Sequence, residues 1–195
     1  MPSWLDDVQG LLARTPIGRF AAETPGVRAA VLVPLFVDGG KLWVLLERRS
    51  GSVQHHPGQV AFPGGVRHGE DVDEVATALR ETHEELGIEP GQVMILGHLS
   101  DVFTTSGYVV SPVVGAIPWP VSLRLAVAEV EDVIRIPVAA LAHPQLVEER
   151  ELALAGRTVA SPVYHYGQTQ VWGATARIIA ELVERLTGGS PAAGA

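Results

Sequence analysis

The stretch GGVRHGEDVDEVATALRETHEELGI, residues 64 to 88, is the most informative part of the chain. Its second half predicts an amphipathic helix over residues 71 to 86, because apolar side chains recur at helical spacing. Asp71 suits the N-cap, with Glu74 three residues later, and Gly87 suits the left-handed position that follows a helix. The stretch therefore predicts a glycine-rich turn that leads into a capped helix.

Three glutamates of this helix raise the question of what they face. Glu81, Glu84 and Glu85 fall within an arc of about 100° on the expected outer face, and like charges at these spacings repel one another. The simpler interpretation is a solvated surface. The alternative is a cation site, because carboxylates supply the hard oxygen ligands that Mg²⁺ and Mn²⁺ prefer. The preceding Gly64 and Gly65 favour the second interpretation, since glycines leave the backbone open to a ligand.

The composition of the chain limits the classes of protein to which it can belong. Its 195 residues are 47% hydrophobic and 18% charged, which fits one folded domain of ordinary size. The net charge of −8, without a cluster of Lys and Arg, argues against nucleic acid as a partner. No apolar run reaches the roughly 18 residues of a membrane span, and the acidic N-terminus is unlike a signal peptide. The absence of cysteine excludes thiolate sites, and we expect a cytoplasmic protein without membrane contact.

Helix and strand patterns alternate along the chain, which predicts an α/β fold. An amphipathic helix is expected at residues 4–12, and two strands joined at Asp38-Gly39-Gly40 follow within residues 28–50. Further strands are expected in VMILGHL, YVVSPVVGAI and DVIRIPV, before a hairpin at residues 146–166 and a closing helix at residues 172–186. We divide the chain into a helical extension, a main domain and a flexible tail, at residues 1–27, 28–187 and 188–195.

Residues 64 to 88 resemble the Nudix box, commonly written G-x5-E-x7-R-E-U-x-E-E-x-G-U with U aliphatic. The second half of the box is matched closely, by Arg80-Glu81, Glu84-Glu85 and Gly87-Ile88. In the first half, the acidic position falls on Asp71, which suits a helix cap better than a ligand, and Arg80 arrives one residue late. Thr82 also stands at a position that is usually aliphatic. The extra residue is found in the coenzyme A pyrophosphatase subfamily of Nudix proteins.

The segment LLERRSGSVQHHPGQVAFPGG, residues 45 to 65, is similar to the signature of that subfamily, L-L-T-x-R-S/A-x3-R-x3-G-x3-F-P-G-G. The positions in register are Leu45, Leu46, Arg49, Ser50, Gly58 and Phe62 to Gly65. Two positions depart from it, because Glu47 replaces the threonine and Gln54 replaces the second arginine. The missing arginine weakens the expected contact with one substrate phosphate, so the choice of substrate within the family stays open.

The resemblance implies a Nudix-type α/β/α sandwich with a central mixed sheet. It also implies a divalent-metal-dependent pyrophosphohydrolase that cleaves coenzyme A, or an acyl derivative, to 3′,5′-ADP and 4′-phosphopantetheine. The implied cofactor is Mg²⁺ or Mn²⁺, held by Glu81, Glu84 and Glu85 with the Gly65 carbonyl. The partner is then a small CoA-like nucleotide, and a homodimer is allowed.

Roles for residues around the box follow from the same resemblance. Arg80 is expected to orient Glu81 and its neighbours through charge-assisted hydrogen bonds. The general base is either a glutamate of the box, for which Glu84 is a candidate, or an acid of the later segment AVAEVEDV. That segment offers Glu129, Glu131 and Asp132, of which Glu129 is preferred. An exposed loop acid explains Glu129 equally well, because only geometry identifies a base.

Five further residues are expected to contact the substrate. Gly64 and Gly65 form the turn before the helix, and Arg49 fits a phosphate contact as well as it fits an ordinary strand end. Phe103 and Tyr108 are expected to stack on adenine or to line the path of the pantetheine arm, although such aromatics equally suit a core.

Two other functions remain as alternatives. The first is the same chemistry on another nucleotide, such as ADP-ribose, a dinucleoside polyphosphate or a nucleoside triphosphate. The second is a catalytically silent module that binds nucleotides, against which the intact Glu81, Glu84 and Glu85 argue. An isomerase of the isopentenyl-diphosphate type is excluded, because its catalytic cysteine has no counterpart in a chain without cysteine.

Overall fold

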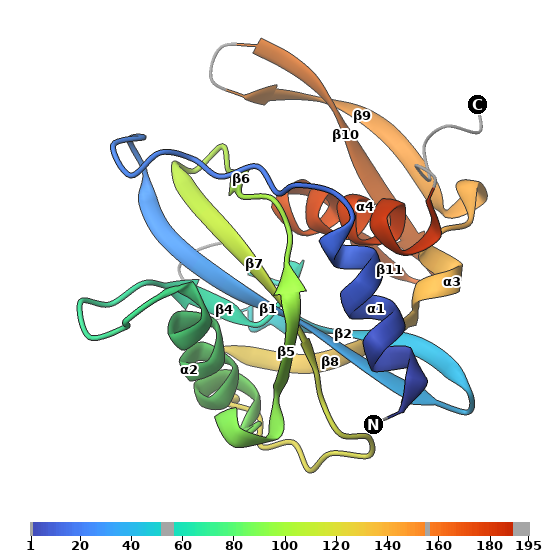
Figure 1. The fold of residues 1–195 in the computed structure, drawn as a ribbon. Helices are drawn as coiled ribbons and strands as arrows, with labels where there is room; N and C mark the ends of the chain where they lie inside the picture. Colours follow the sequence, from blue (N-terminus) through green and yellow to red (C-terminus); the bar gives the residue numbers. More distant parts are fainter. Residues whose placement is uncertain (1, 52–56, 155–156, 189–195) are drawn as a thin grey trace.

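The computed structural model describes residues 2–51, 57–154 and 157–188, and it contains a mixed sheet between helices (Figure 1). The helices are α1 (Ser3–Ala13), α2 (Glu74–Leu86), α3 (Val138–Leu141) and α4 (Gly173–Thr187), with short 3-10 turns at Pro90–Gln92 and Pro144–Leu146. The main sheet contains β1 (Val27–Asp38), β2 (Lys41–Arg49), β3 (Val60–Ala61), β4 (Gly64–Val66), β5 (Met94–His98), β6 (Val102–Phe103), β7 (Tyr108–Ala116) and β8 (Val130–Pro137). A second sheet contains β9 (Val147–Leu154), β10 (Arg157–Tyr166) and β11 (Thr169–Val171).

Strand β1 is central to the main sheet. It pairs in parallel with β7 and antiparallel with β2 and β4, so the sheet is mixed as the resemblance implies. The hairpin expected between β1 and β2 is confirmed, because Asp38 pairs with Lys41 across Gly39 and Gly40. The two glycines have φ angles of 57° and 73°, which is the left-handed backbone that a two-residue turn requires.

Alternate residues of β1 face two different helical layers, because successive side chains of a strand point to opposite faces. Ala30 and Leu32 pack with Ala78 of α2 in one buried cluster. Val33 and Leu35 belong to the larger core, which also contains the buried residues of α1 and α4. Helix α2 therefore covers one face of the sheet and α1 with α4 the other (Figure 1), which confirms the α/β/α sandwich.

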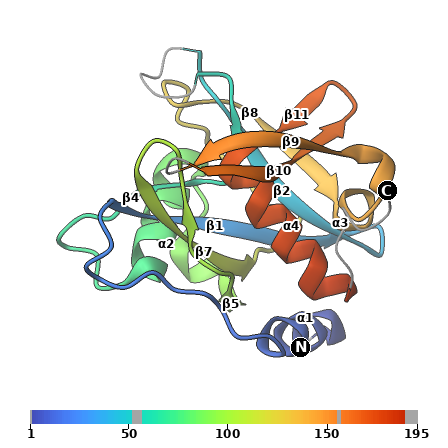
Figure 2. The same ribbon diagram turned by 90° about the horizontal axis from the view of Figure 1, so that it is seen from above.

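Helices α1 and α4 confirm the first and last helices predicted from the sequence. Helix α1 buries Leu5, Val8 and Leu12 in the main core. Helix α4 lies between α1 and the β9–β10 hairpin, as the view from above shows (Figure 2). Of the helices in the described residues, none has the length and apolar character needed to cross a membrane. The expected tail lies, from residue 189 onward, outside the described residues.

Helix α2 begins three residues later than the sequence predicted. Its N-cap is Asp73, whose side chain accepts a 2.8 Å hydrogen bond from the backbone N–H of Ala76. The prediction that Asp71 is the cap is wrong, because the Asp71 carboxylate is bound by the side chain of Arg80 instead. The predicted end is confirmed, since Gly87 follows the helix with a φ of 70°.

Candidate active site

A cavity of about 540 Å³ lies between α2, the turn before β7 and the first turn of α4. One part of its wall is acidic and contains Glu81 and Glu85 of α2. Another part carries the aromatic side chains of Phe103, Tyr108 and Trp172. The volume falls within the range of roughly 300–1,000 Å³ that is typical of small-molecule sites. The cavity thus joins the box carboxylates to the aromatics that were expected to contact the substrate.

Gly64 and Gly65 bring the backbone of β4 against the side chains of α2. The Gly64 N–H donates a 2.8 Å hydrogen bond to Oε2 of Glu85. Gly64 has a φ of 154°, and a Cβ atom on it would overlap the backbone of β1. A Cβ atom on Gly65 would lie 2.5 Å from the carboxyl carbon of Glu81. Gly64 is therefore required by its backbone conformation and by the closeness of β1, whereas a side chain at position 65 would displace the carboxylate of Glu81.

Arg80 holds the acidic side of α2 in place. Its guanidinium donates to both carboxylate oxygens of Asp71, at 3.0 and 2.9 Å, and to Oε1 of Glu81 at 2.9 Å. It also donates to the carbonyl of Val66 at 3.0 Å and pairs with Glu84 at 3.3 Å. The bonds from Arg80 hold the pKa of Asp71 well below its usual range, and the bond to Asp71 raises the pKa of Arg80. Arg80 therefore orients Glu81, in the way that the resemblance implied.

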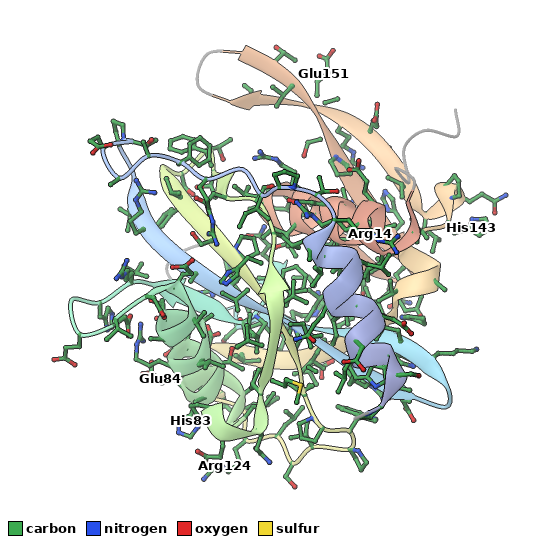
Figure 3. All side chains as sticks on the ribbon, viewed as in Figure 1. Arg14, His83, Glu84, Arg124, His143 and Glu151 are labelled. Carbon is green, nitrogen blue, oxygen red and sulfur yellow. The ribbon has the colours of Figure 1, made fainter. Side chains whose placement is uncertain are left out.

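The three glutamates of the box differ in exposure. Glu85 is only 3% exposed and Glu81 is partly buried, whereas Glu84 projects from the surface of α2 (Figure 3). The expectation that all three lie on an outer face is wrong for Glu85, because the Gly64 turn covers it. Among the residues that the structure describes, no three His, Asp or Glu side chains are grouped as a ready-made metal site. Glu81 and Glu84 are instead drawn to Arg80.

Glu47 of β2 lies behind the acidic wall of the cavity, next to Arg49, and no role was predicted for it from the sequence. Its side chain is fully buried, and neither carboxylate oxygen has a hydrogen-bond partner among the described residues. Nη1 of Arg49 lies 3.9 Å from Oε1 of Glu47 and 3.8 Å from Oε1 of Glu85. The available signal was a carboxylate inside the apolar strand LWVLLERR, since a glutamate is rarely buried there without a partner.

The crowding of carboxylates changes their protonation. Burial is the main reason why the pKa of Glu47 rises to about 7, with smaller contributions from the charges of Glu129 and Glu81. Burial likewise raises the pKa of Glu85 to about 9, aided by the charge of Glu47. Burial also raises the pKa of Glu81. Glu85, and Glu47 in part, therefore retain a proton at neutral pH unless a cation offsets the negative charge.

The donor groups on this wall fit a divalent cation. Glu81 and Glu85 supply hard carboxylate oxygens, and the carboxyl of Glu81 packs directly on Gly65. The unpartnered oxygens of Glu47 are buried polar atoms of the kind that an ion satisfies in a native site. A divalent ion would also reverse the protonation that crowding imposes.

Arg49 and Glu129 lie together at the cavity, although they are far apart in the sequence. Both line its wall, and the carbonyl of Glu129 accepts a 2.7 Å hydrogen bond from the backbone N–H of Ser50. The structure therefore brings the candidate base and the candidate phosphate ligand to the carboxylates of α2. Gln54, where the signature has arginine, lies outside the described residues.

Phe103 and Tyr108 line the cavity rather than the core alone, and both are partly exposed. Arg177 of α4 was missed from the sequence and lies on the same wall. Its Nη1 donates a 2.9 Å hydrogen bond to the carbonyl of Phe103, and burial lowers its pKa. The helical pattern of α4 could not reveal this role, because it depends on where the β6 end meets the helix.

Comparison with known sequences agrees with these features. The NUDIX domain family matches residues 26–155. The chain is 33% identical over 162 residues to the mouse protein named peroxisomal coenzyme A diphosphatase NUDT7. The alignment covers 83% of this chain and 69% of the mouse protein. It is 39% identical over 155 residues to the Nudix hydrolase NudL of Escherichia coli, which covers 80% of each chain. The NudL protein of Photorhabdus laumondii is 37% identical over 158 residues, with 81% and 84% covered.

Comparison with solved structures shows the same fold. A MutT/nudix family protein from Enterococcus faecalis aligns with a TM-score of 0.58 at 15% identity, over 98% of this chain and 78% of the other. A binary complex of the Caenorhabditis elegans Ap4A hydrolase aligns with a TM-score of 0.50 at 24% identity, over 58% and 81% of the two chains. At these identities the likeness concerns the fold alone.

Proposed function

The chain belongs to the NUDIX domain family, and we propose that it hydrolyses the diphosphate of coenzyme A or of a CoA derivative, with Mg²⁺ or Mn²⁺ as cofactor. The products are then 3′,5′-ADP and 4′-phosphopantetheine or its acyl form. The observation that carries the proposal is one cavity in which the box carboxylates and the Gly64–Gly65 turn meet an aromatic wall. The mouse coenzyme A diphosphatase relative and the signature at residues 45–65 support CoA among nucleotide substrates.

The acidic wall is suited to a diphosphate only when its charge is offset. When bound, the divalent ion supplies positive charge to the diphosphate and lowers the pKa of a water molecule. Glu81 and Glu85, which line the cavity, would hold it together with Glu84 and the Gly65 carbonyl. Arg80 keeps Glu81 oriented through its 2.9 Å hydrogen bond, and the Gly64 N–H does the same for Glu85.

Arg49 is the cation that reaches the cavity beside these carboxylates. Its guanidinium lies 3.8 Å from Glu85, which leaves its N–H groups room to turn toward a phosphate oxygen. Arginine presents several donors in a planar fork, and phosphate oxygens match that fork. We assign to Arg49 the binding of one phosphate of the substrate.

Glu129 is the preferred general base. It is exposed at the cavity wall, and the Ser50 N–H holds its backbone beside Arg49. From there its carboxylate accepts the proton of the attacking water. Glu84 is the less suitable candidate, because its exposed side chain is paired with Arg80.

The aromatic wall is assigned to the adenine and to the pantetheine arm of the substrate. Phe103 and Tyr108 offer faces for adenine stacking or an apolar path for the pantetheine arm. Arg177 adds a positive charge to this wall, beside the carbonyl of Phe103.

A substrate panel tests the proposed function. CoA, acetyl-CoA, ADP-ribose, a dinucleoside polyphosphate and the nucleoside triphosphates are each incubated with the protein and Mg²⁺ or Mn²⁺. The products are identified by mass spectrometry. We expect 3′,5′-ADP from CoA at a higher kcat/KM than any product of the other substrates. Cleavage of ADP-ribose without release of 3′,5′-ADP from CoA would show that CoA is not the substrate. No cleavage of any nucleotide would favour a catalytically silent binding module.

A further inference from the structure

We propose that Glu47 of β2 is a further ligand of the metal centre, beside Glu85 of α2. This inference rests on the proposed function and deepens it, because the ligands of the box come from α2 and the preceding turn. It assigns a ligand to a strand on which the resemblance implies a threonine. The centre then joins two elements that are far apart in the sequence.

The first argument is the burial of Glu47 without a partner. Its side chain is fully buried, and both carboxylate oxygens lack a hydrogen bond among the described residues. Buried polar atoms in native proteins almost always have a partner, and a buried carboxylate requires one most strongly. The oxygens therefore have lone pairs available to a cation.

The second argument is the balance of charge around Glu47. Glu81, Glu85 and Glu129 all lie near enough to act electrostatically on its carboxylate. Among the described residues, Arg49 is the cation within 4 Å of Glu47, whereas Arg80 is paired with Asp71 and Glu81. Arg49 alone does not offset the remaining carboxylates of Glu47, Glu85 and Glu129, whereas Arg49 together with a divalent ion does.

The third argument concerns the distances to Arg49. Its Nη1 atom lies 3.9 Å from Glu47 and 3.8 Å from Glu85. A charge-assisted hydrogen bond between a guanidinium and a carboxylate is about 2.7–2.9 Å long. Arg49 therefore does not serve either carboxylate as a hydrogen-bonded partner. A proton shared between Glu47 and Glu85 does not explain the pair either, because no hydrogen bond joins them.

Binding of Mn²⁺ to the metal-free full-length protein tests the proposal without any substrate. The free Mn²⁺ signal is followed by electron paramagnetic resonance during a titration of the wild type, Glu47→Gln and Glu47→Thr. Glu151→Gln is the matched control, because Glu151 is exposed on β9, well away from α2 (Figure 3). We expect both Glu47 variants to bind Mn²⁺ at least tenfold more weakly, or to bind one ion fewer, and the control to match the wild type.

Thermal unfolding distinguishes a ligand from a residue that only supports the fold. In metal-free buffer at pH 8, Glu47→Gln is expected to have a Tm at least equal to that of the wild type, because it removes a buried charge. Added Mn²⁺ is then expected to raise its Tm by less than it raises the Tm of the wild type. A Tm that falls without metal, combined with an unchanged rise on adding Mn²⁺, overturns the proposal.

Two other outcomes also decide the question. Mn²⁺ affinity and stoichiometry that match the wild type in folded Glu47→Gln overturn the inference but leave the proposed function intact. If the wild type binds no Mn²⁺ and yet hydrolyses CoA in the presence of chelator, the metal dependence in the proposed function fails as well. Weaker binding of inorganic pyrophosphate with unchanged Mn²⁺ binding shows that Glu47 acts through Arg49, and this too overturns the ligand assignment.

Discussion

Two arginines flank the carboxylates of α2, and their surroundings differ. Arg80 is locked, with hydrogen bonds of 2.9 to 3.0 Å to Asp71 and Glu81. Arg49 is held less closely by carboxylates, since within the described residues it approaches Glu47 and Glu85 only to 3.9 and 3.8 Å. On the Arg80 side, the charges are paired within the protein, and this pairing positions helix α2. On the Arg49 side, the described carboxylates carry more negative charge than Arg49 offsets, which is the property that a site for a cation and a phosphate requires.

The largest expected effect on activity comes from removing a carboxylate charge on the Arg49 side. Glu85→Gln keeps the size of the side chain and an acceptor for the Gly64 N–H, but it removes a charge from the site. We expect kcat/KM for CoA to fall by roughly 10²–10³-fold, as when one preorganised group is lost from a catalytic site. Steady-state kinetics with Mg²⁺ check this. A variant as active as the wild type would remove the argument for a metal at α2.

Weakening the hydrogen bonds of Arg80 is expected to have a smaller effect on catalysis. Asp71→Asn removes the charge that holds Arg80, so Glu81 is oriented less well. We expect kcat to fall by about 10–100-fold, as for residues that orient metal ligands, with little change in KM. The fold should also lose roughly 1.5–3 kcal/mol, the contribution of a hydrogen bond to a charged group.

Kinetics and urea denaturation of Asp71→Asn are measured beside Glu70→Gln, which changes an exposed neighbouring acid. A loss of stability with wild-type kcat would show that the Arg80 side serves the fold alone.

A methyl group added at Gly65, next to the carboxyl of Glu81, is expected to lower the stability of the fold. In Gly65→Ala the new Cβ atom meets the carboxyl of Glu81, so the side chain or the turn must shift. We expect a loss of about 1–3 kcal/mol in the free energy of unfolding, as for other overpacked sites. Gly69→Ala is the control, because a Cβ atom there has no neighbour within 4 Å among the described residues. Equal unfolding free energies for the two variants would contradict the close contact.

The smallest effect concerns the pH dependence of stability in metal-free protein. The pKa values of Glu47 and Glu85 rise to about 7 and about 9 on folding, from 4.5. The folded state thus retains protons that the unfolded state has released, so stability is fully present below pH 4.5 and falls as the pH rises through 7 and 9. The charges that face the pair are Arg49, Glu81 and Glu129.

Thermal unfolding between pH 5 and pH 9 measures this loss. We expect Tm to fall steadily over this range, and each 1 kcal/mol of lost stability corresponds to roughly 2–4 °C in a chain of this size. Saturating Mn²⁺ should flatten the curve, as should Glu47→Gln. A Tm that rises with pH in metal-free protein would show that the pair is not crowded as described.

The sequence by itself determined the features that depend on local spacing. Helical periodicity places Glu81 and Glu84 on one face, and the Gly39–Gly40 turn and the Gly87 helix end follow from the backbone freedom of glycine. The fold and the family also followed, because the box and the signature are contiguous stretches.

Only the tertiary structure decided which charges are buried and which are paired. Asp71 was expected to cap α2, but the turn at residues 67–73 folds it onto Arg80. Glu47 stands inside the signature, at the position of its threonine, yet its importance depends on the buried side chain lying near Glu85 of α2. Spacing along a helix sets which way a side chain points. Its burial, its pKa and its partners depend on what the sheet packs against it, which no local pattern encodes.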